Sequence, residues 1–338
     1  MTTRLTSEQV VRGLRARGEL WEAGPGLVGL RGEALELSRE MERGLLLAAA
    51  GSGEGCEEWR VPPAIGLDVL ARSGYFASFP QWLTAAAHLS DDPAVLEGVA
   101  VSADPASAAR AALAPADAAL PPAVCYHVYA ALAGRTLGDA PAVVTAQCTC
   151  WRHEGARLRP LARGWAFTMR EAVCVGGGRD VRRFADLGAA RARAFAESLG
   201  LRARLAAAED PFFAPTARGR ALLQRVKALK HELLLPVGGG EEIAAASVNL
   251  HETFFGEAFD IRLPGGGPAS GACVAFGTER WLLAFLCAHG LDAREWPNVG
   301  TRHSAIGTRR GEVISRPDAP AVGGHPRVPT HALPLSSD

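Results

Sequence analysis

Apolar residues recur every three to four positions in several stretches of the chain, which is the spacing of one face of a helix. This pattern predicts helices within residues 1–50, at 180–200 and at 216–236. Thr6 and Gln9 have the spacing of a capping box, which would begin the first of these helices. The N-terminal part of the chain is therefore expected to be helical and to pack on the core that follows it.

Other stretches show strand-like patterns of apolar and polar residues. Residues 143–152, VVTAQCTCWR, and 165–176, WAFTMREAVCVG, are separated by a polar loop and predict an antiparallel hairpin. Residues 243–263 and 271–277 predict further strands. Because helices and antiparallel strands occupy separate stretches, the predicted fold class is α+β, with a mainly antiparallel sheet flanked by helices.

Three runs of consecutive glycines occur at residues 176–178, 238–240 and 265–267. None is followed by Lys and Ser or Thr at the spacing of a phosphate-binding loop, and none opens a dinucleotide fingerprint. We interpret all three runs as hairpin turns.

The composition limits the classes of function. Lys+Arg and Asp+Glu both number 36 among the 338 residues, so the formal net charge is zero, which argues against a general nucleic-acid binder. No apolar run reaches the roughly 18 residues of a membrane span. The seven cysteines lack the spacing of a disulfide framework, so we expect a cytoplasmic protein with free or metal-bound thiols.

The predicted hairpin carries residues suited to a nucleotide. Arg152 and Glu154 lie two positions apart and share one face, and Arg163 and Phe167 share a face of the returning strand. A guanidinium can bind phosphate through two hydrogen bonds, a carboxylate can accept from the exocyclic amine of adenine, and an aromatic ring can lie on a purine. The alternative is a surface hairpin with ordinary salt bridges.

The pattern Arg-x-Glu, a loop and then Arg-x-x-x-Phe resembles motif 2 of the class II aminoacyl-tRNA synthetases. The stretch GACVAFGTERWLLAFL, residues 271–286, resembles motif 3 of the same enzymes, with a turn at Gly277 and a helix that begins near Arg280. The two motifs occur in the order that the class requires. The resemblance implies a class II synthetase catalytic core.

Six further segments narrow the resemblance: VCYHVY, FTMRE, DPFF, ALKHELL, ASVNLHETFFG and ACVAFGTER. They resemble segments of the amino acid:[carrier protein] ligases, which are stand-alone homologues of the catalytic core of atypical, zinc-dependent seryl-tRNA synthetases. The resemblance implies a catalytic domain at 59–305, preceded by a helical segment at 1–58 that packs on it. A Gly-, Pro- and Arg-rich tail at 306–338 is expected to be disordered.

In that family two cysteines and a glutamate hold a catalytic zinc ion. The resemblance places these ligands at Cys125, Glu171 and Cys273. Two thiolates and a carboxylate make a three-ligand zinc site with one open position, which can take the α-amino group of an amino acid. Cys148 and Cys150, which look like a local metal motif, are interpreted as small core residues instead.

The resemblance also implies how ATP is bound. Arg152 is expected at the α-phosphate, and Glu154 and Phe167 are expected at adenine. Arg163 and Arg280 would lie on the outer phosphates, and Arg152 and Arg280 would carry the catalysis by neutralising charge at phosphorus.

Magnesium would accompany ATP, but its ligand is left open. Seryl-type synthetases use a Glu-Ile-Ser-Ser-like turn, whereas this chain has EEIAAASVN, in which Glu241 and Glu242 are out of register. Ser247, Asn249 and His251 are expected to line the amino acid pocket, although His251 could equally be a core imidazole.

The implied activity is the ATP-dependent activation of a small, glycine-like amino acid as an aminoacyl-adenylate. The aminoacyl group would then pass to the phosphopantetheine thiol of a carrier protein. One alternative is a relative that uses tRNA or a small molecule as acceptor, and another is a catalytically silent paralogue.

The partners follow from charge and from the resemblance. Arg218, Arg220 and Arg225 on the predicted helix at 216–236 would dock an acidic carrier, although such a charge run is more often only a solvated face. The zero net charge and the short helical segment disfavour tRNA, and class II cores usually pair, so a homodimer is expected.

Overall fold

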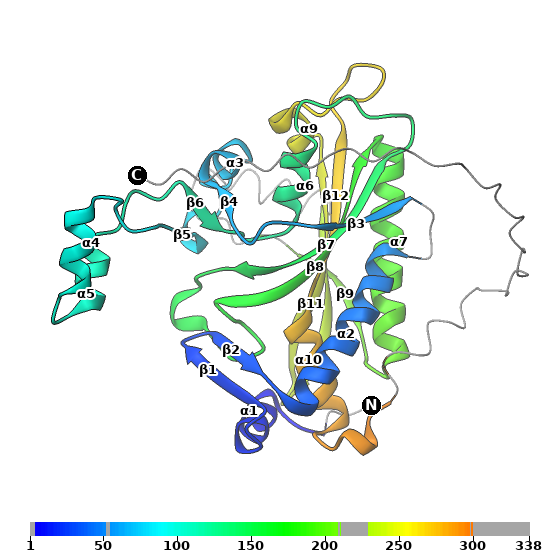
Figure 1. Ribbon diagram of the computed structural model, residues 1–338. Coiled ribbons are helices and arrows are strands. Elements are labelled where there is room, and N and C mark those ends of the chain that lie inside the picture. Colours follow the sequence, from blue (N-terminus) through cyan, green and yellow to red (C-terminus); the bar gives the residue numbers. More distant parts are fainter. Residues whose placement is uncertain (1–3, 52–54, 209, 211–228, 298, 300–338) are drawn as a thin grey trace, which may run out of the picture. The chain divides into compact units, whose positions relative to one another are not determined.

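A seven-stranded sheet forms the centre of the part of the chain that the structure describes (Figure 1). The strand order is β3-β7-β8-β12-β11-β10-β9, and all neighbours are antiparallel except the parallel pair of β3 and β7. The strands are β3 (Cys56–Arg60), β7 (Ala142–Trp151), β8 (Ala166–Gly176), β9 (Arg204–Ala207), β10 (Lys230–Gly238), β11 (Glu241–Glu252) and β12 (Ser270–Gly277). The predicted α+β class and the predicted hairpin of β7 and β8 are both confirmed.

The computed structural model describes residues 4–51, 55–208, 210, 229–297 and 299. All of these belong to one unit, residues 1–303. The predicted tail at 306–338 and the proposed docking residues Arg218, Arg220 and Arg225 lie outside the described residues. Among the described helices, none combines the length and the apolar character needed to cross a membrane.

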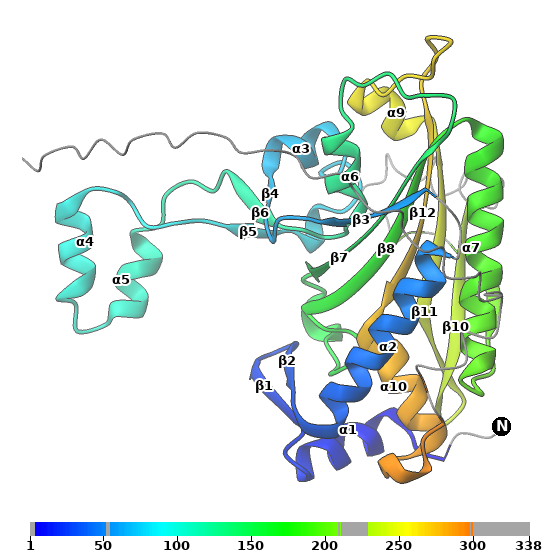
Figure 2. The same ribbon diagram turned by 45° about the vertical axis from the view of Figure 1, so that its right-hand side comes forward.

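Three long helices cover one face of the sheet (Figure 2). They are α2 (Gly32–Ala50), α7 (Gly178–Ser198) and α10 (Thr278–His289). Each follows the apolar periodicity of a core-facing helix, and α10 is buried almost all round. Met41, Phe195 and Trp281, one from each helix, are fully buried in the same cluster. This layer supports the sheet from behind.

The opposite face of the sheet is covered only in part. The short helices α3 (Leu67–Arg72), α6 (Cys125–Ala131) and α9 (Phe254–Phe259) lie on it. Beside them is a small sheet of β4 (Ile65–Gly66), β5 (Thr84–Ala86) and β6 (Ala118–Leu120). Between β5 and β6 the chain projects away from the sheet as α4 (Pro93–Ala100) and α5 (Pro105–Ala111), neither of which has a buried residue.

The periodicity predicted helices throughout the N-terminal segment, but the segment is not wholly helical. The Thr6–Gln9 capping box does begin α1 (Ser7–Ala16). Between α1 and α2, however, the chain forms a hairpin of β1 (Leu20–Gly24) and β2 (Leu27–Leu30). Gly26 adopts a φ of 71° in its turn, a conformation that favours glycine and interrupts any helix.

The helix predicted at 216–236 is wrong over its described part, because residues 230–238 form β10. Leu233, Leu235 and Val237 alternate into the helix-covered core at strand spacing. The strand predicted at 243–263 is also too long, since β11 ends at Glu252 and α9 follows.

Two of the three glycine runs are turns, as predicted. Gly238, Gly239 and Gly240 all have positive φ and join β10 to β11. Residues 265–267 form a turn before β12. The run at 176–178 is not a hairpin turn, because it joins β8 to α7.

Candidate active site

A cavity of about 390 Å³ opens on the partly covered face of the sheet. Its floor comes from β8, β10, β11 and β12, and its walls come from α6, the β7–β8 connection and residues 73–82. The predicted site residues that line it are Cys125, Arg152, Glu154, Arg163, Phe167, Glu171, Ser247, Asn249, His251, Cys273 and Arg280. Folding thus brings together in one cavity every described residue to which a metal, nucleotide or amino acid role was assigned.

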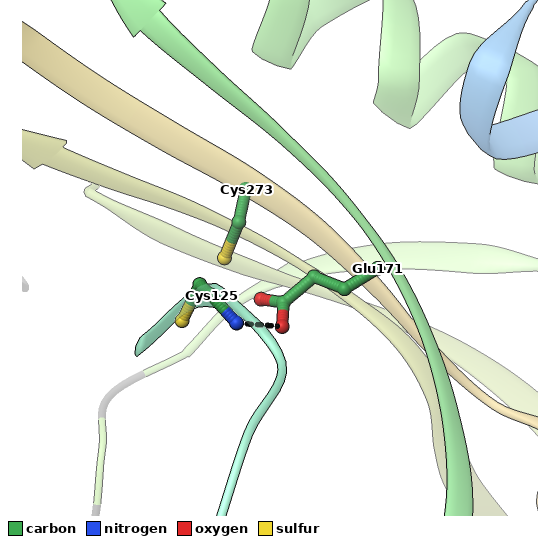
Figure 3. A group of neighbouring side chains, drawn as sticks. All are labelled: Cys125, Glu171 and Cys273. Atoms are coloured by element: carbon green, nitrogen blue, oxygen red, sulfur yellow. Dashed lines mark hydrogen bonds between the residues drawn. The ribbon is translucent and has the colours of Figure 1, made fainter. Parts of the chain in front are cut away.

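Cys125, Glu171 and Cys273 form a compact cluster at the base of the cavity (Figure 3). One ligand atom from each lies within 4.8 Å of the others. Glu171 and Cys273 are diagonal neighbours on β8 and β12, because Glu171 pairs with Ala275 and Cys273 pairs with Val173. Cys125 begins α6, which carries its thiol over the sheet. All three residues are buried.

The chemistry of this cluster fits a metal ion. Burial raises the pKa of Glu171. The hydrogen bond with Cys125, burial and the nearby Glu171 carboxylate raise the pKa of Cys273 well above its usual range. Three crowded acidic groups are costly to ionise together, and a divalent cation would offset that cost. Two thiolates and one carboxylate are typical zinc ligands that leave a fourth position open.

Arg152 follows β7 and points into the cavity between two aromatic rings. Its guanidinium carbon lies 5.1 Å from the ring centre of Trp82 and 5.4 Å from that of Phe167. Its Nε donates to the carbonyl oxygen of Pro122 at 2.9 Å. These contacts fix the guanidinium group where it lines the cavity, which suits the binding of an anion.

Two backbone carbonyl groups hold the Arg280 side chain in place. Its Nε donates to the carbonyl oxygen of Ala162 and its Nη1 to that of Ala244, both at 2.8 Å. Burial, together with the positive charges of Arg163 and Arg152, lowers the pKa of Arg280 to about 10. Three guanidinium groups therefore converge on one cavity, an arrangement that favours a polyanionic ligand.

The neighbouring residue Glu279 holds the strand–turn–helix of β12 and α10 in place. The backbone N–H of Thr168 donates to its carboxylate oxygens at 2.9 and 3.0 Å. This bond ties the start of α10 to β8 and so sets where Arg280 emerges.

Glu154 and Arg163 pair with each other across the β7–β8 connection. The Glu154 side chain is 7% exposed and that of Arg163 is 35% exposed, so the pair is not an ordinary solvated salt bridge. Both side chains line the cavity, although the pairing also satisfies part of their charge.

Glu241 and Glu242, considered for magnesium, lie in a different place. They begin β11 at its exposed turn and pair with Arg159 and Arg204. Neither lines the cavity. Cys148 and Cys150 are also apart from the metal cluster: their sulfurs lie 3.6 Å from each other, and Cys150 is fully buried.

Lys230 is a cavity residue that the apolar pattern did not indicate. It falls within the helix predicted at 216–236, but it lies on β10 and is only 8% exposed. Its Nζ lies 2.6 Å from Asp210 and 3.1 Å from Glu232. Burial lowers the pKa of Lys230, but these two carboxylates raise it more, so the ammonium stays charged. Lys230 pairs with Asn249 across the strands, which places it beside the predicted amino acid pocket.

An aromatic wall of the cavity is a second feature that the periodicity of apolar residues did not indicate. Tyr75, Phe79 and Trp82 line the cavity opposite the sheet floor. Among the described residues, the Tyr75 hydroxyl and the Trp82 indole N–H are buried with no hydrogen-bond partner. Buried polar atoms of this kind are rare in proteins, so they indicate contacts that a ligand would complete.

Known proteins were compared with the chain. No family model matches it. Amino acid–[acyl-carrier-protein] ligase 1 of Bradyrhizobium diazoefficiens is 35% identical over 259 residues, 76% of this chain and 79% of that protein. Ligase 2 of the same organism is 34% identical over 276 residues, 80% and 81% of the two chains. The type-2 serine–tRNA ligase of Methanopyrus kandleri is 28% identical over 163 residues, 44% of this chain and 30% of that enzyme.

Solved structures share the fold. The seryl-tRNA synthetase of M. kandleri, solved in complex with A. aeolicus tRNASec, matches with a TM-score of 0.76 at 21% identity, covering 88% of this chain and 62% of that chain. The prolyl-tRNA synthetase of Cryptosporidium parvum matches with a TM-score of 0.62 at 12% identity, covering 84% and 52%. The predicted class II synthetase core is therefore confirmed as the fold.

Proposed function

Because the chain belongs to the amino acid–[acyl-carrier-protein] ligase family, we propose that it activates an amino acid with ATP and transfers it to a carrier protein. In the first step a carboxylate oxygen of the amino acid attacks the α-phosphorus of ATP, and the bond to pyrophosphate breaks. In the second step the phosphopantetheine thiol loses its proton and attacks the carbonyl carbon. The carbon–oxygen bond to AMP then breaks, which leaves an aminoacyl thioester.

The observation that carries this proposal is the presence of two anchors in one cavity. The Cys125–Glu171–Cys273 cluster lies at the base, and the guanidinium groups of Arg152 and Arg280 face the same space. An enzyme that joins an amino acid to AMP needs one anchor for the amine and one for the phosphate, within the length of a single adenylate.

The metal cluster would hold the amino acid. When zinc is bound by Cys125, Glu171 and Cys273, it supplies an open position for the α-amino group. Bulky rings surround the cluster, since Tyr126 and Phe255 are buried against it with ring centres 6.0 Å apart. This crowding supports a small amino acid, with glycine as the first candidate.

Ser247, Asn249 and His251 on β11 would line the amino acid pocket. Lys230, next to Asn249, adds a charged ammonium on the same side. We propose that Lys230 attracts the amino acid carboxylate before activation and orients it toward the phosphate.

The arginines would hold ATP. Arg152 faces the α-phosphate, and Arg163 and Arg280 face the outer phosphates, where they neutralise the charge that develops as pyrophosphate leaves. Phe167 would stack on adenine and Glu154 would accept from its amine. Magnesium would enter bound to ATP.

The acceptor and the assembly are also proposals. The carrier would present its arm to the cavity, and docking through Arg218, Arg220 and Arg225 remains a prediction. A cytoplasmic homodimer likewise remains a prediction.

The test has two stages. Pyrophosphate exchange into ATP is measured across a panel of amino acids, with and without a zinc chelator. Exchange with a small amino acid that stops on chelation and returns with zinc is the expected result. Labelled amino acid is then offered with a carrier that bears the phosphopantetheine arm, with the same carrier without the arm as the control.

Each stage has an outcome that contradicts the proposal. Absence of exchange with every small amino acid would overturn activation and favour a catalytically silent protein. A different acceptor is indicated if pyrophosphate exchange occurs while the carrier with the phosphopantetheine arm stays unlabelled and tRNA or a small amine becomes labelled. That result would show that the acceptor is the tRNA or the amine and not the carrier.

A further inference from the structure

His251 lies between the metal cluster and a buried tyrosine. Its Nδ1 lies 2.8 Å from the hydroxyl of Tyr129, and its Nε2 lies 3.7 Å from the sulfur of Cys273. Phe255 closes the remaining side, with its ring centre 4.8 Å from that of the imidazole and the two planes perpendicular. The imidazole is therefore held at both nitrogens, one of them against a predicted metal ligand.

The backbone around His251 is shaped for this position. Leu250 pairs with Ala272 and Glu252 pairs with Gly271, so His251 is the extra residue of a β-bulge in β11. Glu252 adopts a φ of 50°, which is rare for a residue other than glycine. Bulges are frequent beside active sites, where they redirect a side chain.

Gly271 makes room for the tyrosine of this arrangement. A Cβ atom at Gly271 would lie 2.1 Å from the Tyr129 hydroxyl, closer than any real contact. The hydroxyl thus occupies the space of the missing side chain, two residues before Cys273 on the same strand. The bulge and the glycine together bring Tyr129, His251 and Cys273 into one row.

The row has a definite direction of hydrogen bonding. A sulfur that ligates a metal is a thiolate, which accepts hydrogen bonds and cannot donate them. The nitrogen that faces it must then carry the proton, so Nε2 donates and Nδ1 keeps a lone pair. The Tyr129 hydroxyl can donate to that lone pair. Asn249 adds a second donor, because its Nδ2 donates to the same sulfur at 3.4 Å.

We propose that His251 is a positioning residue for the metal centre, with its Nε2–H donated to the Cys273 thiolate and its ring held in place by the Tyr129 hydroxyl, which donates to Nδ1. This inference rests on the proposed metal site. His251 does not belong to the cluster of three donors found among the described residues, so it acts through Cys273 and not as a ligand. A hydrogen bond to a ligating sulfur orients it and disperses its negative charge.

The experiment compares the zinc affinity of the wild-type protein with that of three variants by competition against a chromogenic chelator. Tyr129→Phe removes the hydroxyl alone, His251→Asn removes the donor that faces Cys273, and His251→Gln keeps an N–H near the position of Nε2. We expect about a tenfold loss of affinity for Tyr129→Phe and about ten- to a hundredfold for His251→Asn, with partial recovery in His251→Gln.

Replacing zinc by cobalt gives an absorption spectrum that would not change if His251 had only a structural role. The thiolate-to-cobalt charge-transfer band should shift to longer wavelength in both variants, because the sulfur loses the Nε2–H bond in His251→Asn and that bond loses its alignment in Tyr129→Phe. Thr278→Val is the matched control, since it removes another buried hydroxyl that has no partner among the described residues and does not line the cavity. Its zinc affinity and cobalt spectrum should equal those of the wild type.

The possible outcomes separate the inference from the function on which it rests. If the wild-type protein binds no zinc, the metal site and this inference both fall. If it binds zinc and the Tyr129→Phe variant has the same affinity and the same cobalt band, only the role of His251 is overturned. Tyr129→Phe decides the matter even if the His251 variants fail to fold.

Discussion

The backbone N–H of Cys125 donates to Oε2 of Glu171 at 2.8 Å, although the two residues are 46 positions apart. This bond satisfies one carboxylate oxygen with the first turn of α6 and leaves the other directed at the two thiols (Figure 3). The position of the Cys125 sulfur over the sheet and the orientation of the carboxylate are therefore set by the same contact.

Glu171→Gln separates metal binding from folding. The amide oxygen can still accept from Cys125, so the fold should persist, but the side chain no longer supplies a negative charge. We expect zinc affinity to fall by at least about tenfold and pyrophosphate exchange to fall with it. Chelator competition and elemental analysis of the purified protein measure the loss.

Glu279→Gln is the matched control for that variant. Glu279 is also a buried carboxylate that accepts from a backbone N–H, and it also lines the cavity, but it lies outside the metal cluster. Its variant should retain the wild-type zinc content. Equal zinc content in both variants would exclude Glu171 as a ligand.

Arg280→Lys should impair activation more than metal binding. Lysine cannot donate to both Ala162 and Ala244 while presenting a further nitrogen to a phosphate. We expect the rate of pyrophosphate exchange to fall by about 10²–10³. The unpaired carbonyls should also lower the free energy of unfolding by about 1–3 kcal/mol.

Arg159→Lys provides the comparison for Arg280→Lys. Arg159 is exposed and pairs with Glu241 outside the cavity, so its exchange rate and stability should stay near those of the wild type. A similar loss of exchange in both variants, or no loss in Arg280→Lys, would contradict the proposed phosphate contact.

The proposed nucleotide half of the cavity could be located from the sequence because its signals are local. Arg152 and Phe167 belong to one hairpin, and Gly277 and Arg280 belong to one strand–turn–helix. The metal half could not be derived from spacing. Cys125, Glu171 and Cys273 come from α6, β8 and β12, and only the pairing of β8 with β12 and the packing of α6 bring them together. Resemblance to a family supplied what periodicity could not.

Lys230 shows how a wrong period hides a residue that lines the cavity. Leu229 and Leu233 have helical spacing, which favoured the helix predicted at 216–236. The alternation of Leu233, Leu235 and Val237 is equally clear, and in a strand it turns Lys230 toward the opposite face. A short apolar run cannot by itself distinguish the helical period from the strand period. Here the pairing of β10 with β11 decides in favour of the strand.

Lys230→Met should destabilise the protein and reduce activation. It removes the ammonium that pairs with the partly buried carboxylates of Asp210 and Glu232, a loss of about 3–5 kcal/mol for a buried pair. The double variant Lys230→Met, Glu232→Gln should recover part of the unfolding free energy, because one of the stranded charges is gone. Denaturant titration of the wild type, Lys230→Met, Glu232→Gln and the double variant gives the coupling energy.

Amino acid saturation distinguishes a structural Lys230 from a functional one. We expect the KM for the amino acid to rise in Lys230→Met and to stay high in the double variant, even where stability recovers. A KM that returned to the wild-type value together with stability would limit Lys230 to a structural role.

Tyr75→Phe should make the protein more stable, most clearly at alkaline pH. The Tyr75 hydroxyl is buried without a partner among the described residues, a situation that costs about 1–3 kcal/mol, so its removal should be neutral or stabilising at neutral pH.

Burial raises the pKa of Tyr75 to about 12, whereas an unfolded tyrosine ionises near about 10. Below pH 10 the phenol is protonated in both states, so its ionisation does not yet lower the free energy of unfolding. As the pH rises through 10 toward 12, the unfolded chain loses this proton first, so the wild-type free energy of unfolding falls. Phenylalanine lacks this ionisation, so the stability difference between the two proteins should widen over that interval in urea titrations at constant ionic strength. Parallel stability curves from pH 7 to 12 would show that the hydroxyl reaches solvent or a partner in the folded protein.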